Sequence, residues 1–182
     1  MHGRLGEASE IWRQSLEIDP LAAVVYNNRA VGLLWQGRLD EALSDARMVL
    51  ELSPQREAAH SLVGAVYLAQ AKPDAALQEI LQETSERQRL LALAEVYHAL
   101  GRAAESEAAR ASYMENYQDN APFSIACFHA LRGEPDEAFE WLDRAYAERD
   151  PYLAWMKVHL DLKNLRSDPR WLPFLRKMRL AG

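Results

Sequence analysis

The chain has 182 residues, of which 49% are hydrophobic, so it is long enough to bury a core of ordinary domain size. Its formal net charge is −6, with both signs interspersed and no block of Lys or Arg that could follow a phosphate backbone, which argues against a nucleic-acid partner. A single Cys excludes an internal disulfide framework and favours a reducing, cytoplasmic setting, and no apolar run of about 18 residues is available to span a membrane.

Two motifs near the N-terminus return later in the chain. The segment from Gly3 to Ala8 (GRLGEA) recurs from Gly37 to Ala42 (GRLDEA), and the segment LEIDP, which ends at Pro20, recurs as LELSP, both at an offset of 34 residues. A repeat of that length, with a small residue in its second helix and a closing proline, resembles the tetratricopeptide repeat. The composition agrees, because only 8 Gly and 8 Pro interrupt a chain rich in strong helix formers.

The resemblance implies an all-α fold, a right-handed superhelical α-solenoid of antiparallel helical hairpins with a C-terminal capping helix. In the clearest copy, Tyr26 stands at the leading aromatic position, Gly37 marks the turn between the helices and Pro54 closes the unit. The predicted order is the second helix of a truncated first repeat at 1–22, repeats at 23–56, 57–86, 87–118 and 119–151, and a capping segment at 152–182.

Small residues punctuate the predicted hairpins. One position in each first helix is small, which lets neighbouring helices approach closely; these positions are Ala30, Gly64, Ala94 and Ala126. Glycines mark the turns of three hairpins, where we expect the left-handed conformation that ends many helices; they are Gly37, Gly101 and Gly133.

The N-terminal segment 1–22 aligns with a second helix whose first helix would lie upstream of Met1. Its apolar residues would therefore be only partly covered, since terminal repeats normally need a polar cap. We expect either that the chain is a fragment or that Leu5, Ile11 and Trp12 form a surface for self-association.

The 34-residue period is lost after Pro151. Asp168 and Pro169 predict the N-cap and first residue of a short helix. The apolar residues that follow recur at helical spacing and are predicted to seal the last hairpin: Trp171, Leu172, Leu175 and Met178.

The run LRSDPRW that leads into this helix resembles the closing segment of bacterial multidomain proteins. In those proteins a tetratricopeptide array follows a nucleotide cyclase, a kinase or a winged-helix regulatory domain. An ordinary capping helix with the same start is the alternative interpretation.

No catalytic constellation is apparent. Cys127 lies on a small, apolar helical face without the base and orienting group that a nucleophile needs. His60, His98 and His129 occupy similar places in successive first helices, but such positions lie about 10 Å apart in adjacent repeats, too far for a shared metal. The sequence therefore predicts no enzyme, no metal site and no cofactor.

The remaining candidate site is a concave groove, which the family resemblance assigns to the first helices of the hairpins. Its predicted lining is Val24, Asn27, Asn28, Val31, Leu34, Trp35, Ser61, Ala65, Leu68, Leu91, Glu95, His98, Phe123 and Ser124. Because no Lys or Arg belongs to this lining, a clamp for a peptide's terminal carboxylate is disfavoured. An extended or helical peptide with apolar anchors fits better, with Trp35 as the main anchor.

The sequence thus favours a non-catalytic protein-interaction scaffold that binds a protein or peptide, as part of a cytoplasmic bacterial regulatory protein. A homodimerising module that uses the N-terminal half-repeat is one alternative. A small-ligand sensor that uses the polar groups of the groove is another.

Overall fold

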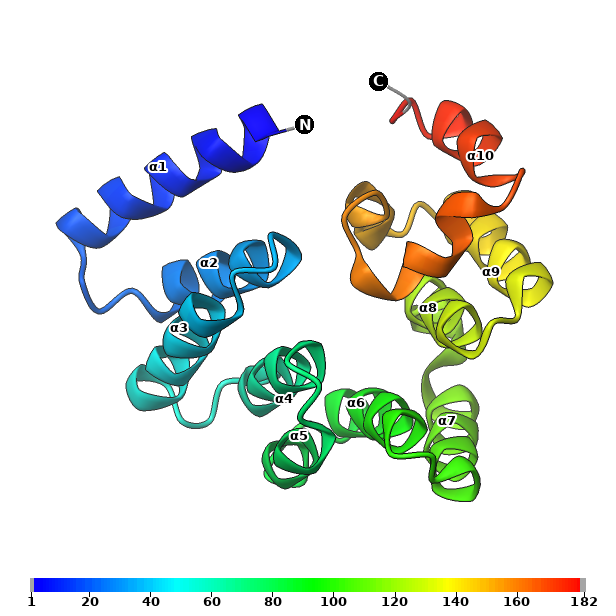
Figure 1. Cartoon of the computed structure of the whole chain (residues 1–182), viewed down its shortest axis with the longest axis horizontal. Coiled ribbons are helices and arrows are strands. Elements are labelled where there is room, and N and C mark those ends of the chain that lie inside the picture. Colours follow the sequence, from blue (N-terminus) through cyan, green and yellow to red (C-terminus); the bar gives the residue numbers. More distant parts are fainter. Residues whose placement is uncertain (1, 181–182) are drawn as a thin grey trace. The chain divides into compact units, whose positions relative to one another are not determined.

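The computed structural model describes residues 2–180, and every regular element in that range is a helix. The α-helices are α1 (His2–Ile18), α2 (Ala23–Trp35), α3 (Leu39–Leu52), α4 (Ala59–Ala69), α5 (Pro73–Ile80), α6 (Glu86–Ala99), α7 (Ala103–Tyr117), α8 (Pro122–Arg132), α9 (Pro135–Glu148) and α10 (Trp171–Lys177). Shorter 3-10 helices are η1 (Gln118–Asn120), η2 (Pro151–Trp155) and η3 (Leu160–Ser167) (Figure 1).

The chain divides into two compact units, residues 1–103 and residues 104–182. The division falls at the start of α7, inside the predicted repeat 87–118, so that α6 belongs to the first unit and α7 to the second. The predicted boundary between residues 56 and 57 falls in the link between α3 and α4, whereas the one between residues 86 and 87 falls one residue inside α6. The boundaries after residues 118 and 151 fall inside η1 and η2.

Consecutive helices of the first unit pack as hairpins, α2 against α3 and α4 against α5 (Figure 1). The small residues of the first helices lie at packed positions, as predicted: Ala30 and Ala94 are buried, and Gly64 lies directly against α5. A Cβ added at Gly64 would lie 2.6 Å from Cγ1 of Ile80, which is itself fully buried and has no room to move. The close approach of α4 and α5 therefore requires glycine at this position.

The start of α4 is held by a buried carboxylate that the sequence did not indicate. Glu83, which is 2% exposed, accepts hydrogen bonds from the backbone N–H groups of Ala58 at 3.3 Å, Ser61 at 3.2 Å and Ser85 at 3.1 Å. A negative charge at a helix N-terminus satisfies unpaired N–H groups and complements the helix dipole. Glu83 thus fixes the link between α5 and α6 to the beginning of α4.

The second unit has one continuous core beneath its C-terminal segment. The hairpin of α8 and α9 is covered by η2, η3 and α10, which bury Trp171, Phe174 and Leu175. The prediction that these residues seal the hairpin is confirmed for Trp171 and Leu175, and Met178 packs at the edge of this core. It is wrong for Leu172, which is 58% exposed. Phe174 takes that place, because residues three and four apart share a helix face whereas adjacent residues do not.

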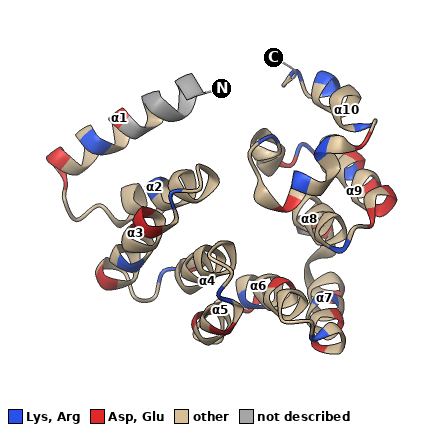
Figure 2. Cartoon of the chain, viewed as in Figure 1, with Lys and Arg blue, Asp and Glu red and all other residues tan. Residues whose placement is uncertain are grey.

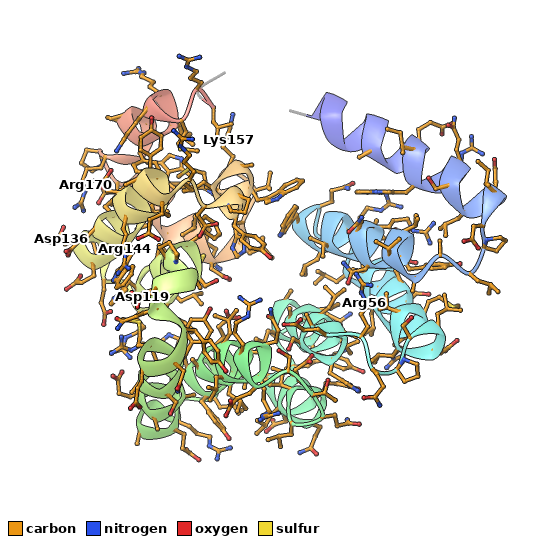
Figure 3. All side chains as sticks on the ribbon, turned by 180° about the vertical axis from the view of Figure 1, so that it is seen from behind. Arg56, Asp119, Asp136, Arg144, Lys157 and Arg170 are labelled. Atoms are coloured by element: carbon orange, nitrogen blue, oxygen red, sulfur yellow. The ribbon has the colours of Figure 1, made fainter. Side chains whose placement is uncertain are left out.

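The start of α10 also differs from the prediction. The helix begins at Trp171, and Pro169 lies in the turn before it. Arg170 donates from Nη1 to Oδ1 of Asp136 in α9 at 2.7 Å, and Arg144 of α9 donates from Nη2 to Oδ1 of Asp119 at 3.0 Å (Figure 3). Both pairs are exposed to solvent, so they orient the elements more than they stabilise them.

Candidate interaction surface

The first helices of the first unit lie side by side, because α4 contacts both α2 and α6. We call nine of their candidate residues the first-helix face. Val24, Asn28 and His98 are exposed, and the remaining members are partly buried: Asn27, Val31, Trp35, Ala65, Leu91 and Glu95. The predicted lining is therefore brought together across α2, α4 and α6.

Other predicted lining residues of the first unit serve the fold. Leu34 is 7% exposed and belongs to the core of its hairpin. Leu68 packs against a cluster that contains Ile80 and Val96. The Ser61 hydroxyl donates to Oε2 of Glu83 at 3.2 Å and so takes part in holding the start of α4. Leu34 is buried, whereas Ser61 and Leu68 are partly buried but have side chains that take part in these contacts.

The predicted residues of α8 lie in the second unit, and one of them is covered. Phe123 is 2% exposed, with its ring stacked on Tyr152 at a centroid distance of 6.4 Å and edge-on to His159 at 5.3 Å. The prediction of an open lining residue is wrong for Phe123, because the chain after Pro151 folds back over α8. Ser124 beside it is partly buried.

Positive charges near the first-helix face are already engaged. Arg29 donates from Nε and Nη2 to the two carboxylate oxygens of Asp45 at 2.5 and 2.6 Å, and these hydrogen bonds raise the pKa of Arg29. Arg89 donates to the carbonyl oxygen of Glu83 at 2.7 Å, and Arg87 lies 3.8 Å from Glu57.

These arginines are the Lys and Arg residues of α2 and α6, where His98 is the other basic side chain, and α4 carries no Lys, Arg, Asp or Glu (Figure 2). A partner's terminal carboxylate would have to displace an existing contact of one of them. A carboxylate clamp built on these three arginines is therefore disfavoured.

A second apolar surface lies on α1 and the link that follows it. Ile11 and Ile18 are 60% and 86% exposed, and seven residues apart they share one helix face. Leu21, which the sequence analysis did not single out, is 71% exposed in the link. We call these three residues the α1 surface.

Trp12 is a packing residue and not part of the α1 surface. A Cβ added at Gly32 of α2 would lie 2.4 Å from Cη2 of the Trp12 ring, so the ring rests directly on the α2 backbone. The side chain of Leu5, the remaining predicted self-association residue, lies outside the described residues. Of the predicted self-association residues, Ile11 thus belongs to the α1 surface and Trp12 does not, while Ile18 and Leu21 are added to it.

The second unit gathers three metal-ligating side chains that the sequence analysis did not connect. Cys127 Sγ lies 3.8 Å from Nδ1 of His159, which lies 3.3 Å from Oδ2 of Asp161, and all three ligand atoms are within 4.8 Å of one another. Burial raises the pKa of Asp161, while the neighbouring His159 and Lys163 act in the opposite direction. Because 32 residues separate Cys127 from His159, no local spacing motif could reveal this cluster.

Two of the other histidines are paired with carboxylates. His60 Nδ1 lies 3.0 Å from Glu79, and His129 Nδ1 lies 2.8 Å from Glu134. His98 is exposed on α6. The three histidines thus have separate environments.

Comparisons with known proteins agree with this architecture. Residues 22–53 match a family model described as tetratricopeptide repeat. Among solved structures, the chain is similar to one titled "Crystal structure of MamA", with a TM-score of 0.55 and 16% sequence identity over 84% of this chain and 93% of that chain. The predicted all-α helical-repeat fold is confirmed, and residues 22–53 coincide closely with the predicted repeat 23–56.

None of the helices within residues 2–180 is both long enough and apolar enough to cross a bilayer.

Proposed function

We propose that this chain is a non-catalytic scaffold, within a cytoplasmic bacterial regulatory protein, that binds a peptide segment of a partner on the first-helix face. Stacked helical hairpins commonly use extended surfaces of this kind for binding. The observation that carries the proposal is the contact of α4 with both α2 and α6, which joins three helices into one candidate surface.

The chemistry of the first-helix face favours a peptide with apolar anchors. Val24, Trp35 and Leu91 offer apolar surface, and Asn27 and Asn28 carry amides that can both donate to and accept from a peptide backbone. Trp35 is partly buried, which leaves part of an amphipathic ring for contact at a low entropic cost. Recognition would then rest on apolar burial and neutral hydrogen bonds.

The test uses peptides selected from a random-sequence display library on the immobilised wild-type chain. Replacing Trp35 by Ala should weaken the selected peptides by about 2 kcal/mol or more, roughly 30-fold in Kd, because large aromatic anchors dominate such interfaces. Isothermal titration calorimetry measures the change, and circular dichroism checks that the helices are retained.

Leu81→Ala is the matched control. Leu81 is 53% exposed and follows α5, which is the second helix of its hairpin. The substitution therefore removes apolar surface from the same unit but outside the first-helix face. Equal losses for both variants, or unchanged affinity in Trp35→Ala, would remove Trp35 from the site.

Self-association is the second candidate function, and the exposure of the α1 surface favours it. Ile11, Ile18 and Leu21 are large apolar side chains, each with more than half of its surface exposed. A second copy of the chain could cover this area through an isologous contact. The two functions use different residues and are compatible.

A further inference from the structure

We propose that Cys127, His159 and Asp161 form a binding site for one divalent transition-metal ion, with Zn²⁺ as the best-fitting ion. A thiolate, an imidazole and a carboxylate are the donor types that protein zinc sites use. Cys127 comes from α8, whereas His159 and Asp161 flank the start of η3. The second unit folds so that two segments of the chain contribute ligands to one point.

Two of the three distances between the ligand atoms match the edges of a tetrahedral site. With a Zn–S bond of about 2.3 Å and Zn–N and Zn–O bonds of about 2.0 to 2.2 Å, the sulfur and nitrogen should lie about 3.5 Å apart and the nitrogen and oxygen about 3.4 Å apart. The corresponding separations are 3.8 Å between Cys127 and His159 and 3.3 Å between His159 and Asp161. Both separations are within a few tenths of an ångström of the tetrahedral values, and the third pair of ligand atoms, from Cys127 and Asp161, lies within 4.8 Å.

The surroundings hold the ligands in place and leave a path for an ion. Cys127 is 3% exposed and forms the floor of the site, whereas the side chains of His159 and Asp161 are 28% and 22% exposed. The Phe123 ring lies edge-on to the imidazole, and Arg166 donates to the carbonyl oxygen of His159 at 3.1 Å. An ion would enter from the solvent side, where a water molecule can complete the fourth position.

A nucleophilic Cys-His-Asp relay is the competing interpretation, and the geometry disfavours it. In such a relay the nucleophile and the carboxylate bind opposite nitrogens of the imidazole. Here both Cys127 and Asp161 approach Nδ1 of His159. The buried thiol also offers an electrophile little access. Convergence on one ring nitrogen is the arrangement that a shared ion would produce.

The ion would have a structural consequence for the second unit. It would tie α8 to the segment between η2 and η3, which covers the hairpin core. A ligand that binds only the folded state stabilises it by mass action, so Zn²⁺ should raise the melting temperature of the chain. This inference does not depend on the first-helix face.

The first experiment titrates Co²⁺ into the full, metal-stripped chain in a thiol-free buffer and records its absorption spectrum. Cys127 is the only cysteine of the sequence, so a thiolate-to-cobalt charge-transfer band from a monomeric complex can arise only at this site. We expect the band to saturate at one ion per chain and to disappear when Zn²⁺ is added. A spectrum without the band overturns the proposal, and this test needs no variant that might fail to fold.

The second experiment measures Zn²⁺ affinity by competition with a chromogenic chelator. Cys127→Ser, His159→Gln and Asp161→Asn should each lower the affinity by about a hundredfold or more, since each removes one ligand with little change in volume. His129→Gln is the matched control, because His129 lies on the same helix and is paired with Glu134. Affinity that survives Cys127→Ser, or that falls equally in the control, contradicts the proposal.

Discussion

Asp168 and Arg170 fix the turn that leads into α10. The Asp168 carboxylate accepts hydrogen bonds from the backbone N–H of Arg170 at 2.8 Å, from its Nε at 2.9 Å and from its Nη2 at 2.8 Å. The guanidinium also lies 4.5 Å above the Phe139 ring. The hydrogen bonds with Arg170, chiefly those of its side chain, lower the pKa of Asp168 from 3.8 to about 2.

The depressed pKa of Asp168 predicts a direction of pH dependence. A carboxyl group with a lowered folded-state pKa contributes stability above its unfolded value, and this contribution is lost as the pH falls from about 3.8 to about 2. Carboxyl-carbon NMR should place the Asp168 titration near 2, and Arg170→Gln should move it back toward 3.8.

Arg166→Gln is the control for this titration, because Arg166 is close in sequence but donates to the carbonyl oxygen of His159 instead. An Asp168 pKa near its ordinary value in the wild-type chain, or one that shifts equally in both variants, would show that the Arg170 contacts do not form.

At the scale of the elements, the hairpins share one way of ending their first helices. Gly37, Gly101 and Gly133 have φ values of 74°, 72° and 73°, as the sequence predicted. The hairpin of α4 and α5 places Ala71 at the equivalent position, with a φ of 57°. The hydrogen bonds match, since the N–H of Arg38 donates to Leu33 and that of Lys72 to Tyr67, both at 2.9 Å.

This equivalence predicts opposite effects for two reciprocal substitutions. Ala71→Gly should stabilise the chain by roughly 0.5 to 1 kcal/mol, because glycine adopts the left-handed conformation without the steric cost that alanine has there. Gly37→Ala should destabilise it by about 1 kcal/mol, although an added Cβ would meet no atom within 4 Å. Urea unfolding followed by circular dichroism measures both changes, and effects of the same sign would contradict the strain argument.

At the scale of the whole molecule, the α1 surface raises the question of oligomeric state. Light scattering over a concentration series should show a dimer of the wild-type chain that dissociates in the double variant Ile11→Glu and Ile18→Glu, because charges on a buried apolar contact are costly. Trp12 is left intact, since its ring supports the packing of α1 on α2.

Leu172→Glu is the control for association. Leu172 is 58% exposed in the second unit. The variant therefore also replaces an exposed apolar side chain by Glu, but outside the α1 surface. A wild-type chain that remains monomeric at every concentration would rule out the α1 surface as a self-association site and leave the first-helix face as the remaining candidate.

The sequence by itself determined the helical class, the repeat and the turns. These features are encoded locally, in an offset of 34 residues, in helix-forming segments and in single positions such as Gly37, Gly64 and Ala30. Local encoding is readable because each hairpin reuses the same backbone conformation and contacts mainly its neighbours.

Only the tertiary structure decided which apolar and polar residues face one another. Phe123 is buried and Leu172 exposed because the C-terminal segment folds back over the hairpin of α8 and α9. Glu83 accepts a hydrogen bond from Ala58, and Cys127 lies next to His159, because separate elements of the chain pack together. Burial and coordination depend on atoms from distant parts of the chain, and no periodicity within one segment contains that information.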